Sequence, residues 1–323
     1  MTYTYMSWIV KTVTVFALAA YTIWLLFLQN DISSLIGSFH WSFDKLLVIG
    51  IVLCMSTINW GMEILKWHIA IKPLTMSLVK SAKSVLTGIA LGLITPARVG
   101  EYVGRMIYVT NKQRMWSGIA TFRCSLAQSS VTYTMGIISF FYLNKTGILI
   151  PSIGINADVF LLLSIFLLTV MLLVFVKLDR LLPLIGKLPT YWKQKLRIDQ
   201  QDSSFDGVTF STQSQLLILF YATLRYAVYL IQFGFLLLMI GHHSSVLELF
   251  SAISLIFLIQ SLLPVPALAK VFARTGAAAG VFTLLGYGTK EVITASLVIW
   301  VINLLLPALC GLVFLLKLEK EKV

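Results

Sequence analysis

The stretch SVLTGIALGLITPA, residues 84–97, is apolar enough for the interior of a membrane but too short to cross one. A spanning helix needs about 20 apolar residues, whereas this run ends at Thr95-Pro96, where proline removes a backbone N–H and stops a helix. Short apolar pieces interrupted in this way are typical of re-entrant or broken helices. The stretch therefore predicts a helix that enters the membrane and turns back.

The composition of the whole chain supports a membrane setting for this stretch. Of 323 residues, 58% are hydrophobic and 12% are charged, whereas an ordinary soluble domain has about 25% charged residues. A bilayer solvates so much apolar surface directly. The formal net charge of +12 would suggest nucleic acid in a soluble protein. Here the bases lie in short stretches between apolar runs, so we expect anionic lipid headgroups as partners and no nucleic acid.

Other apolar segments complete the expected fold. Those long enough to span a membrane are roughly 8–28, 46–65, 120–143, 159–176, 214–240 and 292–316. A further run, about 249–287, breaks at two prolines and resumes as a Gly/Ala-rich piece, so we expect it to be re-entrant like the first hairpin, about 80–105. The sequence predicts an all-α integral membrane protein: one polytopic domain over residues 1–323, with about six transmembrane helices and two re-entrant hairpins.

Lysine and arginine predict the orientation of these helices, because cytoplasmic loops carry an excess of positive charge. Bases are frequent after the second span, after the fourth span and in the C-terminal tail, and they are scarce in the alternate loops. We therefore expect a multi-pass protein of the cytoplasmic (inner) membrane with both termini in the cytoplasm. The two hairpins then enter from opposite sides. Opposed broken helices are typical of a transporter site near the bilayer middle and are compatible with an inverted repeat.

The residues that follow the first break are charged. Arg98, Glu101 and Arg105 recur at spacings of three and four, which puts them on one helical face. Gly100 and Gly104 lie on another face and allow a neighbouring helix to approach closely. Two interpretations stay open. Either the helix lies at the membrane surface with solvated charges, or the arginines bind an anionic lipid phosphate while the glutamate orients one of them.

The second hairpin carries a comparable basic pair. Lys270 and Arg274 lie four residues apart, on one helical face, so they are candidates for a second lipid-phosphate contact opposite the first. The alternative is that both side chains reach outward to the headgroups. The expected hinge or helix-break positions of the two hairpins are Pro96, Gly100, Pro264 and Pro266.

Three other ionisable groups lie in or near the predicted spans. For Glu63 we favour a local ion pair with Lys66 at the end of the second span. Arg123 and Arg225 fit snorkelling to the headgroups and a substrate path about equally well. The two adjacent histidines of the chain have no acidic or cysteine partner at ligand spacing. We expect no metal site and no cofactor.

The segment PARVGEYVGR, residues 96–105, resembles the P-x-R-x-G-E motif of the lysylphosphatidylglycerol synthase transmembrane-region-like family. Length, span spacing and the late Pro-x-Pro hairpin extend the resemblance over nearly the whole chain. It implies a flippase-like membrane domain, of the kind that also forms the translocating part of bacterial multiple peptide resistance factors. The second hairpin of such families usually reads P-x-P-G-G-x-G followed by an acidic residue, whereas Ala267-Leu268-Ala269-Lys270 follows the second proline here.

These features together predict a lipid translocator for an anionic phospholipid or a polyprenyl-phosphate-linked lipid. The chain has no phosphate-cradling GxxxxGK[ST], no HExxH and no GxSxG motif, so we assign no catalytic residue and do not expect an enzyme. Two alternatives remain. One is a non-catalytic membrane partner of a lipid-modifying enzyme; the other is an intramembrane enzyme acting on a lipid phosphate, in which Glu101 would do acid–base work.

Overall fold

The computed structural model describes residues 43–95, 98–147, 157–186, 210–238, 245–262 and 269–320. Within these ranges every regular element is helical, as the sequence predicted. The first predicted span, residues 8–28, and the expected hinges Pro96, Pro264 and Pro266 lie outside the described residues.

The described helices fall into long ones and short ones. They are α3 (Phe43–Ala70), α4 (Leu78–Ile94), α5 (Val99–Met106), α6 (Arg114–Lys145), α7 (Ala157–Gly186), α9 (Thr212–Leu238), α10 (Val246–Leu262), α11 (Ala269–Leu284), α12 (Thr289–Trp300) and α13 (Leu306–Lys320). A π-helical turn, Val301–Leu305, joins α12 to α13, so these two form one continuous rod.

Four stretches of helix are long and apolar enough to cross a membrane. They are Leu46–Ala70, Asp158–Arg180, Thr212–Leu238 and Val292–Lys317, which lie in α3, α7, α9 and the α12–α13 rod. Each coincides with one of the predicted spans. The all-α membrane fold is therefore confirmed.

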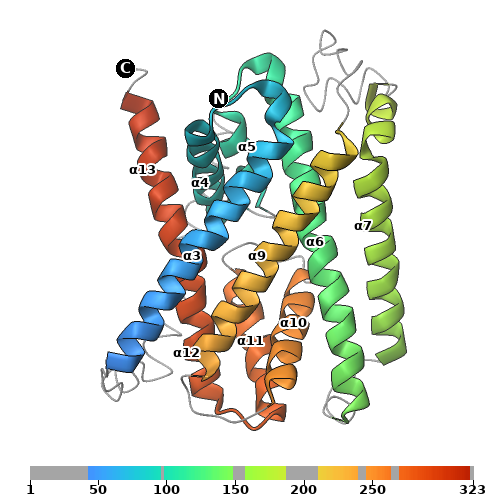
Figure 1. The fold of residues 1–323 in the computed structure, drawn as a ribbon, viewed down its shortest axis with the longest axis vertical. Coiled ribbons are helices and arrows are strands. Elements are labelled where there is room, and N and C mark those ends of the chain that lie inside the picture. Colours follow the sequence, from blue (N-terminus) through green and yellow to red (C-terminus); the bar gives the residue numbers. More distant parts are fainter. Residues whose placement is uncertain are drawn as a thin grey trace, which may run out of the picture.

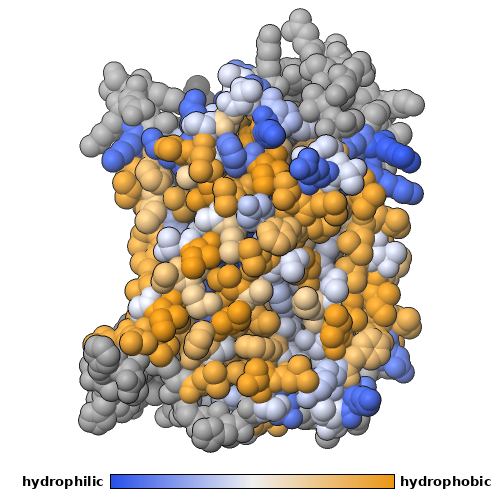
Figure 2. Space-filling model, in the orientation of Figure 1, coloured by the Kyte–Doolittle hydropathy of each residue, from blue (hydrophilic) through white to orange (hydrophobic). Residues whose placement is uncertain are grey.

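The surface of the molecule agrees with a membrane setting. Figure 2 shows a broad hydrophobic band, with hydrophilic residues gathered mainly at the end drawn at the top. Leucine, valine and phenylalanine side chains of the long helices point outward, including Leu162, Phe166, Leu216 and Phe220. Water would oppose such exposure, whereas lipid chains solvate it.

The predicted span 120–143 lies in α6, which is long but much less apolar than the other spans. Its neighbours explain this difference, because α6 packs against α7, α9 and α10 and contributes many buried residues (Figure 1). Its hydroxyl side chains, such as Thr121, Ser125 and Thr134, donate hydrogen bonds to carbonyl groups one turn earlier. A helix surrounded by protein needs fewer lipid-facing apolar residues. The total of six spans stays a prediction.

Two pairs of short helices lie at opposite ends of the bundle. Figure 1 shows α4 and α5 in the upper half, and α10 and α11 in the lower half. The helices of each pair pack against each other. This is the placement that opposed hairpins would have; their re-entrant character and the inverted repeat stay predictions.

Glycines allow α4 to pack closely with helices on two sides. A Cβ atom added at Gly100 of α5 would lie 2.2 Å from the Leu91 carbonyl oxygen of α4. One added at Gly104 would lie 2.6 Å from the Gly88 Cα of the same helix. A Cβ added at Gly311 of α13 would lie 2.0 Å from the carbonyl oxygen of residue 86. The close approach predicted for the two α5 glycines is confirmed, and α4 is held between α5 and α13.

Replacing Gly104 by Ala tests this packing. The added methyl group meets backbone atoms of α4 that cannot move independently, so we expect a loss of stability of about 1–3 kcal/mol, as for other overpacked cores. The measurement is the apparent Tm of the purified protein in detergent. Gly61→Ala is the matched control, because a Cβ at Gly61 of α3 meets nothing within 4 Å. Equal Tm values for the two variants would contradict the close packing.

Candidate functional site

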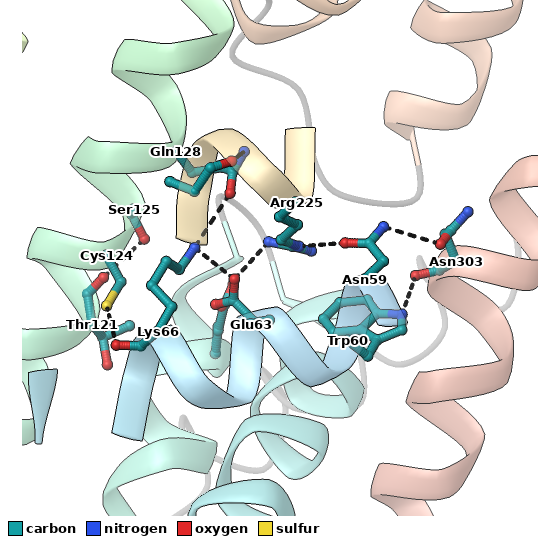
Figure 3. A network of polar contacts seen from close by, with 12 residues as sticks. Asn59, Trp60, Glu63, Lys66, Thr121, Cys124, Ser125, Gln128, Arg225 and Asn303 are labelled. Carbon is teal, nitrogen blue, oxygen red and sulfur yellow. Dashed lines mark hydrogen bonds and ion pairs between the residues drawn. The ribbon is translucent and has the colours of Figure 1, made fainter. Parts of the chain in front are cut away.

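A buried carboxylate, that of Glu63 in α3, is shared by three basic side chains. It pairs with the Lys66 Nζ at 2.6 Å, the Arg105 Nη2 at 2.9 Å and the Arg225 Nη1 at 2.6 Å. These bases come from α3, α5 and α9. Figure 3 shows Lys66 and Arg225 converging on Glu63 from either side. One carboxylate thus joins three helices that are far apart in the sequence.

The predicted pair of Glu63 with Lys66 is therefore present, but its predicted setting at a helix end is wrong. Helix α3 continues to Ala70, and both side chains are buried. Lys66 also donates to the Oε1 of Gln128 in α6 at 3.3 Å. Local sequence spacing could not reveal these further contacts, because Gln128 and the other bases that pair with Glu63 come from helices distant in the sequence.

A second carboxylate, that of Glu101 in α5, lies beside the first. It pairs with the Arg105 Nη2 at 2.5 Å and with the Arg98 Nη2 at 3.0 Å. The predicted charged face of Arg98, Glu101 and Arg105 is thus formed. Arg105 joins it to Glu63, since its Nη2 contacts both carboxylates. We call these six residues, Glu63, Lys66, Arg98, Glu101, Arg105 and Arg225, the charge cluster.

The backbone holds Arg98 in an unusual conformation at the turn between α4 and α5. Its φ of 58° lies in the left-handed region, which residues other than glycine rarely adopt. The neighbouring Thr95 side chain accepts a hydrogen bond from the Gly100 N–H at 2.7 Å and donates to the Leu91 carbonyl at 2.9 Å. The turn is thus fixed on both sides of Arg98. Such conformations are often kept at functional sites.

Burial separates the basic residues of the charge cluster into two groups. The side chains of Lys66 and Arg105 are each 1% exposed, whereas those of Arg225 and Arg98 are 21% and 39% exposed. The interpretation of α5 as a solvated surface helix does not fit Arg105. Lys66 and Arg105 hold the two carboxylates in place, and Arg98 and Arg225 remain within reach of a ligand.

The charge cluster carries more positive than negative charge. Four basic side chains face two carboxylates, an excess of two formal positive charges. Within the described part of the chain, the Nε and Nη1 of Arg105 are buried and have no hydrogen-bond partner. Uncompensated charge is costly in a low-dielectric interior and is a common mark of function inside a membrane. The cluster is therefore suited to receiving an anion.

A chain of buried amides extends from the charge cluster to the π-helical turn and back to α9. The Nε of Arg225 donates to Asn59 at 2.8 Å, and Asn59 donates to Asn303 at 3.3 Å (Figure 3). Asn303 in turn donates to Gln232 at 2.7 Å. Sequence reasoning missed these amides. Their signal was a polar side chain at one position of an otherwise apolar span.

The π-helical turn fits this network. The turn contains Asn303, and two side chains of α3 donate to its carbonyl groups: Ser56 Oγ to that of Ile302 at 3.1 Å and Trp60 Nε1 to that of Asn303 at 3.1 Å. Such turns leave carbonyl groups without their usual partners and often occur at functional sites. Here α3 supplies the missing donors and so locks the rod to the charge cluster.

Arg274 of α11 lies in the second half of the molecule, as predicted, and contacts two neighbouring helices. Its Nε donates to Gln260 of α10 at 3.1 Å, its Nη1 donates to the hydroxyl of Tyr229 of α9, and its guanidinium lies 5.4 Å from the Tyr229 ring. It pairs with no carboxylate of the described residues. Tyr229 follows Arg225 by one helical turn, so α9 connects the charge cluster to Arg274. The side chain of Lys270 lies outside the described residues.

The Arg123 side chain forms a buried ion pair and does not reach toward the headgroups. It is fully buried, pairs with Asp179 of α7 at 2.6 Å and lies 3.9 Å from the Phe210 ring. Neither snorkelling nor a substrate path describes this setting. It ties α6 to α7. Arg225 likewise points into the protein, toward Asn59 and Glu63, so snorkelling does not describe it either.

Removing the shared carboxylate tests the charge cluster. Glu63→Gln removes the carboxylate partner of Lys66 and Arg225 and leaves Arg105 with Glu101 alone, and breaking a buried pair in this way costs about 3–5 kcal/mol. We expect a much lower apparent Tm in detergent. Adding Arg225→Gln should recover part of the loss, because one uncompensated cation is removed. A double variant whose loss equals the sum of the two single losses would show that the two residues do not interact.

Comparison with known proteins agrees with the resemblance that the motif at residues 96–105 indicated. The family model described as the lysylphosphatidylglycerol synthase TM region matches residues 9–311. No curated protein and no solved structure gives a significant match. Because the family model covers most of the chain, the protein belongs to the lysylphosphatidylglycerol synthase TM region family, as its sequence resemblance indicated.

Proposed function

We propose that this member of the family is a lipid translocator that moves a phosphate-bearing lipid between the leaflets of the cytoplasmic membrane. The observation that carries the proposal is the charge cluster, which holds an excess of two positive charges within a bundle of membrane helices. Membership of a flippase-like family supports it. The substrate is an anionic phospholipid or a polyprenyl-phosphate-linked lipid, since both carry the phosphate that such a cluster would bind.

Arg98 and Arg225 are the residues that contact the lipid phosphate in this proposal, because they are the accessible bases of the charge cluster. Their guanidinium groups suit phosphate through several donors in one plane. Glu101 and Glu63 orient them, and Arg105 and Lys66 position these carboxylates. A phosphate on Arg225 would compete with Glu63 and Asn59, which both bond that side chain.

Arg274 is the next contact along the proposed path. It lacks a carboxylate partner among the described residues, and Tyr229 links it to the helix that carries Arg225. Lys270, four residues before it, is the second base of this contact that the sequence spacing predicts. A phosphate that leaves Arg225 would then meet a second basic site in the other half of the molecule, as a transport path between two leaflets requires.

We also propose an orientation with both termini in the cytoplasm. The upper end of the molecule in Figure 1 carries the end of α3, the start of α4 and the end of α13. Its described bases include Lys72, Lys80, Lys83, Arg114 and Lys317. An excess of lysine and arginine favours the cytoplasmic side. Transport in this scheme needs binding and release but no chemical step, so the chain acts as a carrier and not as an enzyme.

Replacing Arg98 by Asn tests the proposed function. Asparagine tolerates the left-handed backbone that this position requires, so the change removes the charge and spares the turn. We expect the purified protein in liposomes to flip a fluorescent phosphatidylglycerol at least about tenfold more slowly, because a charge-assisted contact is lost. The assay is dithionite quenching of the outer leaflet.

Arg180→Asn is the matched control, because Arg180 is an exposed arginine of α7 outside the charge cluster. It should flip the lipid at the unmodified rate. Wild-type protein that flips neither phosphatidylglycerol nor a polyprenyl phosphate would contradict the proposed function. Formation of a new lipid product by the purified protein would point to the enzyme alternative, and activity that appears only with a co-purified partner would point to a partner role.

A further inference from the structure

A cavity of about 420 Å³ opens at the start of the α4–α5 helix pair, away from the charge cluster. Three segments form its walls: the link between α3 and α4, the first turns of α4, and the link between α5 and α6. The lining residues are Leu74, Thr75, Met76, Ser77, Val79, Lys80, Lys83, Tyr108, Val109, Thr110 and Gln113. None of the roles assigned above uses this cavity.

The lining of the cavity is basic and rich in hydrogen-bonding groups. It contains two lysines, Lys80 and Lys83, and no acidic residue. No carboxylate of the described residues pairs with either lysine. Between residues 66 and 123 the sequence holds a single acid, Glu101, which lies in the charge cluster. An anion in the cavity would therefore meet positive charge, and no carboxylate of the described residues would compete with it.

The walls of the cavity are held by specific contacts. The Gln113 side chain accepts a hydrogen bond from the Thr110 N–H at 3.3 Å, which leaves its amide N–H groups as donors. Ser77 accepts from the Lys80 N–H at 3.3 Å. Thr75 has a φ of 52° and, with Arg98, is one of two non-glycine residues of positive φ among the described residues. One of the two lies in the cavity wall and the other at the turn between α4 and α5.

The cavity and the charge cluster share the same two helices. Tyr108 of the cavity wall bonds Thr87 of α4 at 3.1 Å, and Ser84 of α4 bonds the Arg105 carbonyl at 3.1 Å. Lys83 lies near the start of α4 and Arg98 follows its end. An α-helix rises about 1.5 Å per residue, so Lys83 and the last residue of α4, Ile94, are roughly 16 Å apart along the helix. One phosphate cannot contact both sites at once.

We propose that this cavity is a separate binding site for the anionic headgroup of the lipid, occupied before the phosphate reaches Arg98. Lys80 and Lys83 bind the phosphate, and the hydroxyl and amide groups of Ser77, Thr110 and Gln113 bind the polar part of the headgroup. The apolar residues Leu74, Met76 and Val79 border the acyl chains. This inference rests on the proposed function for the fate of the lipid, but headgroup binding can be measured without transport.

The test is binding of dihexanoyl phosphatidylglycerol, a short-chain soluble lipid, to the purified full-length protein in nanodiscs of phosphatidylcholine. We expect Lys80→Gln with Lys83→Gln to weaken binding by about tenfold or more, because two charge-assisted contacts are lost. The matched control is Lys72→Gln with Lys317→Gln, which removes the same charge from exposed lysines that do not line the cavity. The control should bind within about twofold of the unmodified protein, since screened surface charge contributes little.

Equal affinity of the two double variants would overturn the site. Dihexanoyl phosphatidylcholine that binds as tightly as the phosphatidylglycerol would overturn its preference for an anionic headgroup. Inorganic phosphate should compete only at a large excess. Competition at the same concentration as the lipid would show a site for free phosphate and overturn the headgroup assignment.

Transport separates a failure of this inference from a failure of the proposed function. In liposomes of graded phosphatidylglycerol content, the Lys80/Lys83 variant should flip slowly at low content and approach the unmodified rate at high content. Arg98→Asn should be slow at every content. If the Lys80/Lys83 variant matches its control while Arg98→Asn is slow, the cavity site is wrong and the translocator stands. If the unmodified protein flips no lipid but the cavity binds the headgroup as expected, the translocator is wrong and the site stands.

Discussion

The carboxylate of Glu63 is the contact on which the arrangement of the helices around the site depends. Three bases share it, one each from α3, α5 and α9. Long segments of the chain separate these helices from one another. Inside a membrane the hydrophobic effect does not draw helices together, because lipid chains solvate apolar side chains as well as other helices do. A shared buried anion supplies the attraction that is missing. Removing it would leave Lys66 and Arg225 without a carboxylate partner in a medium of low dielectric.

Close glycine packing and the charge cluster act on the same helix pair. The glycines of α5 bring its backbone against that of α4, and this contact sets the depth at which Arg105 meets Glu63. Gly311 fixes the other side of α4 against α13, whose π-helical turn is held in turn by Ser56 and Trp60 of α3. Steric packing therefore positions the charges, and the charges lock α3 and α9 to the pair. Neither set of contacts alone would hold α4, α5 and α9 in register.

The sequence predicted the elements better than it predicted the partners between them. Apolar runs identified four helices long enough to span, and the spacing of Arg98, Glu101 and Arg105 predicted a shared face that the structure contains. Glu63 was placed beside Lys66, but its other partners lie 42 and 162 positions away in the chain. Local spacing carries no information about such contacts. The sequence also predicted the hydroxyl-rich span 120–143. Its low apolar content is explained by packing against three helices, which the sequence does not reveal.

Burial also changes which of the predicted residues can meet a ligand. Arg98 and Arg105 look equivalent in the motif, since both flank Glu101 on one face. Arg105 is enclosed and bonded to both carboxylates, whereas Arg98 stands at the turn with its side chain partly open. A phosphate that binds Arg98 can therefore take it from Glu101 while Arg105 keeps both carboxylates in place. Binding at Arg225 would have a different consequence, because an anion there would compete with Glu63 for the guanidinium and so weaken a contact between α3 and α9. A ligand shifts a conformational equilibrium only through such differences in affinity between states. The exchange at Arg225 is thus the step at which binding of an anion would act on the positions of the helices.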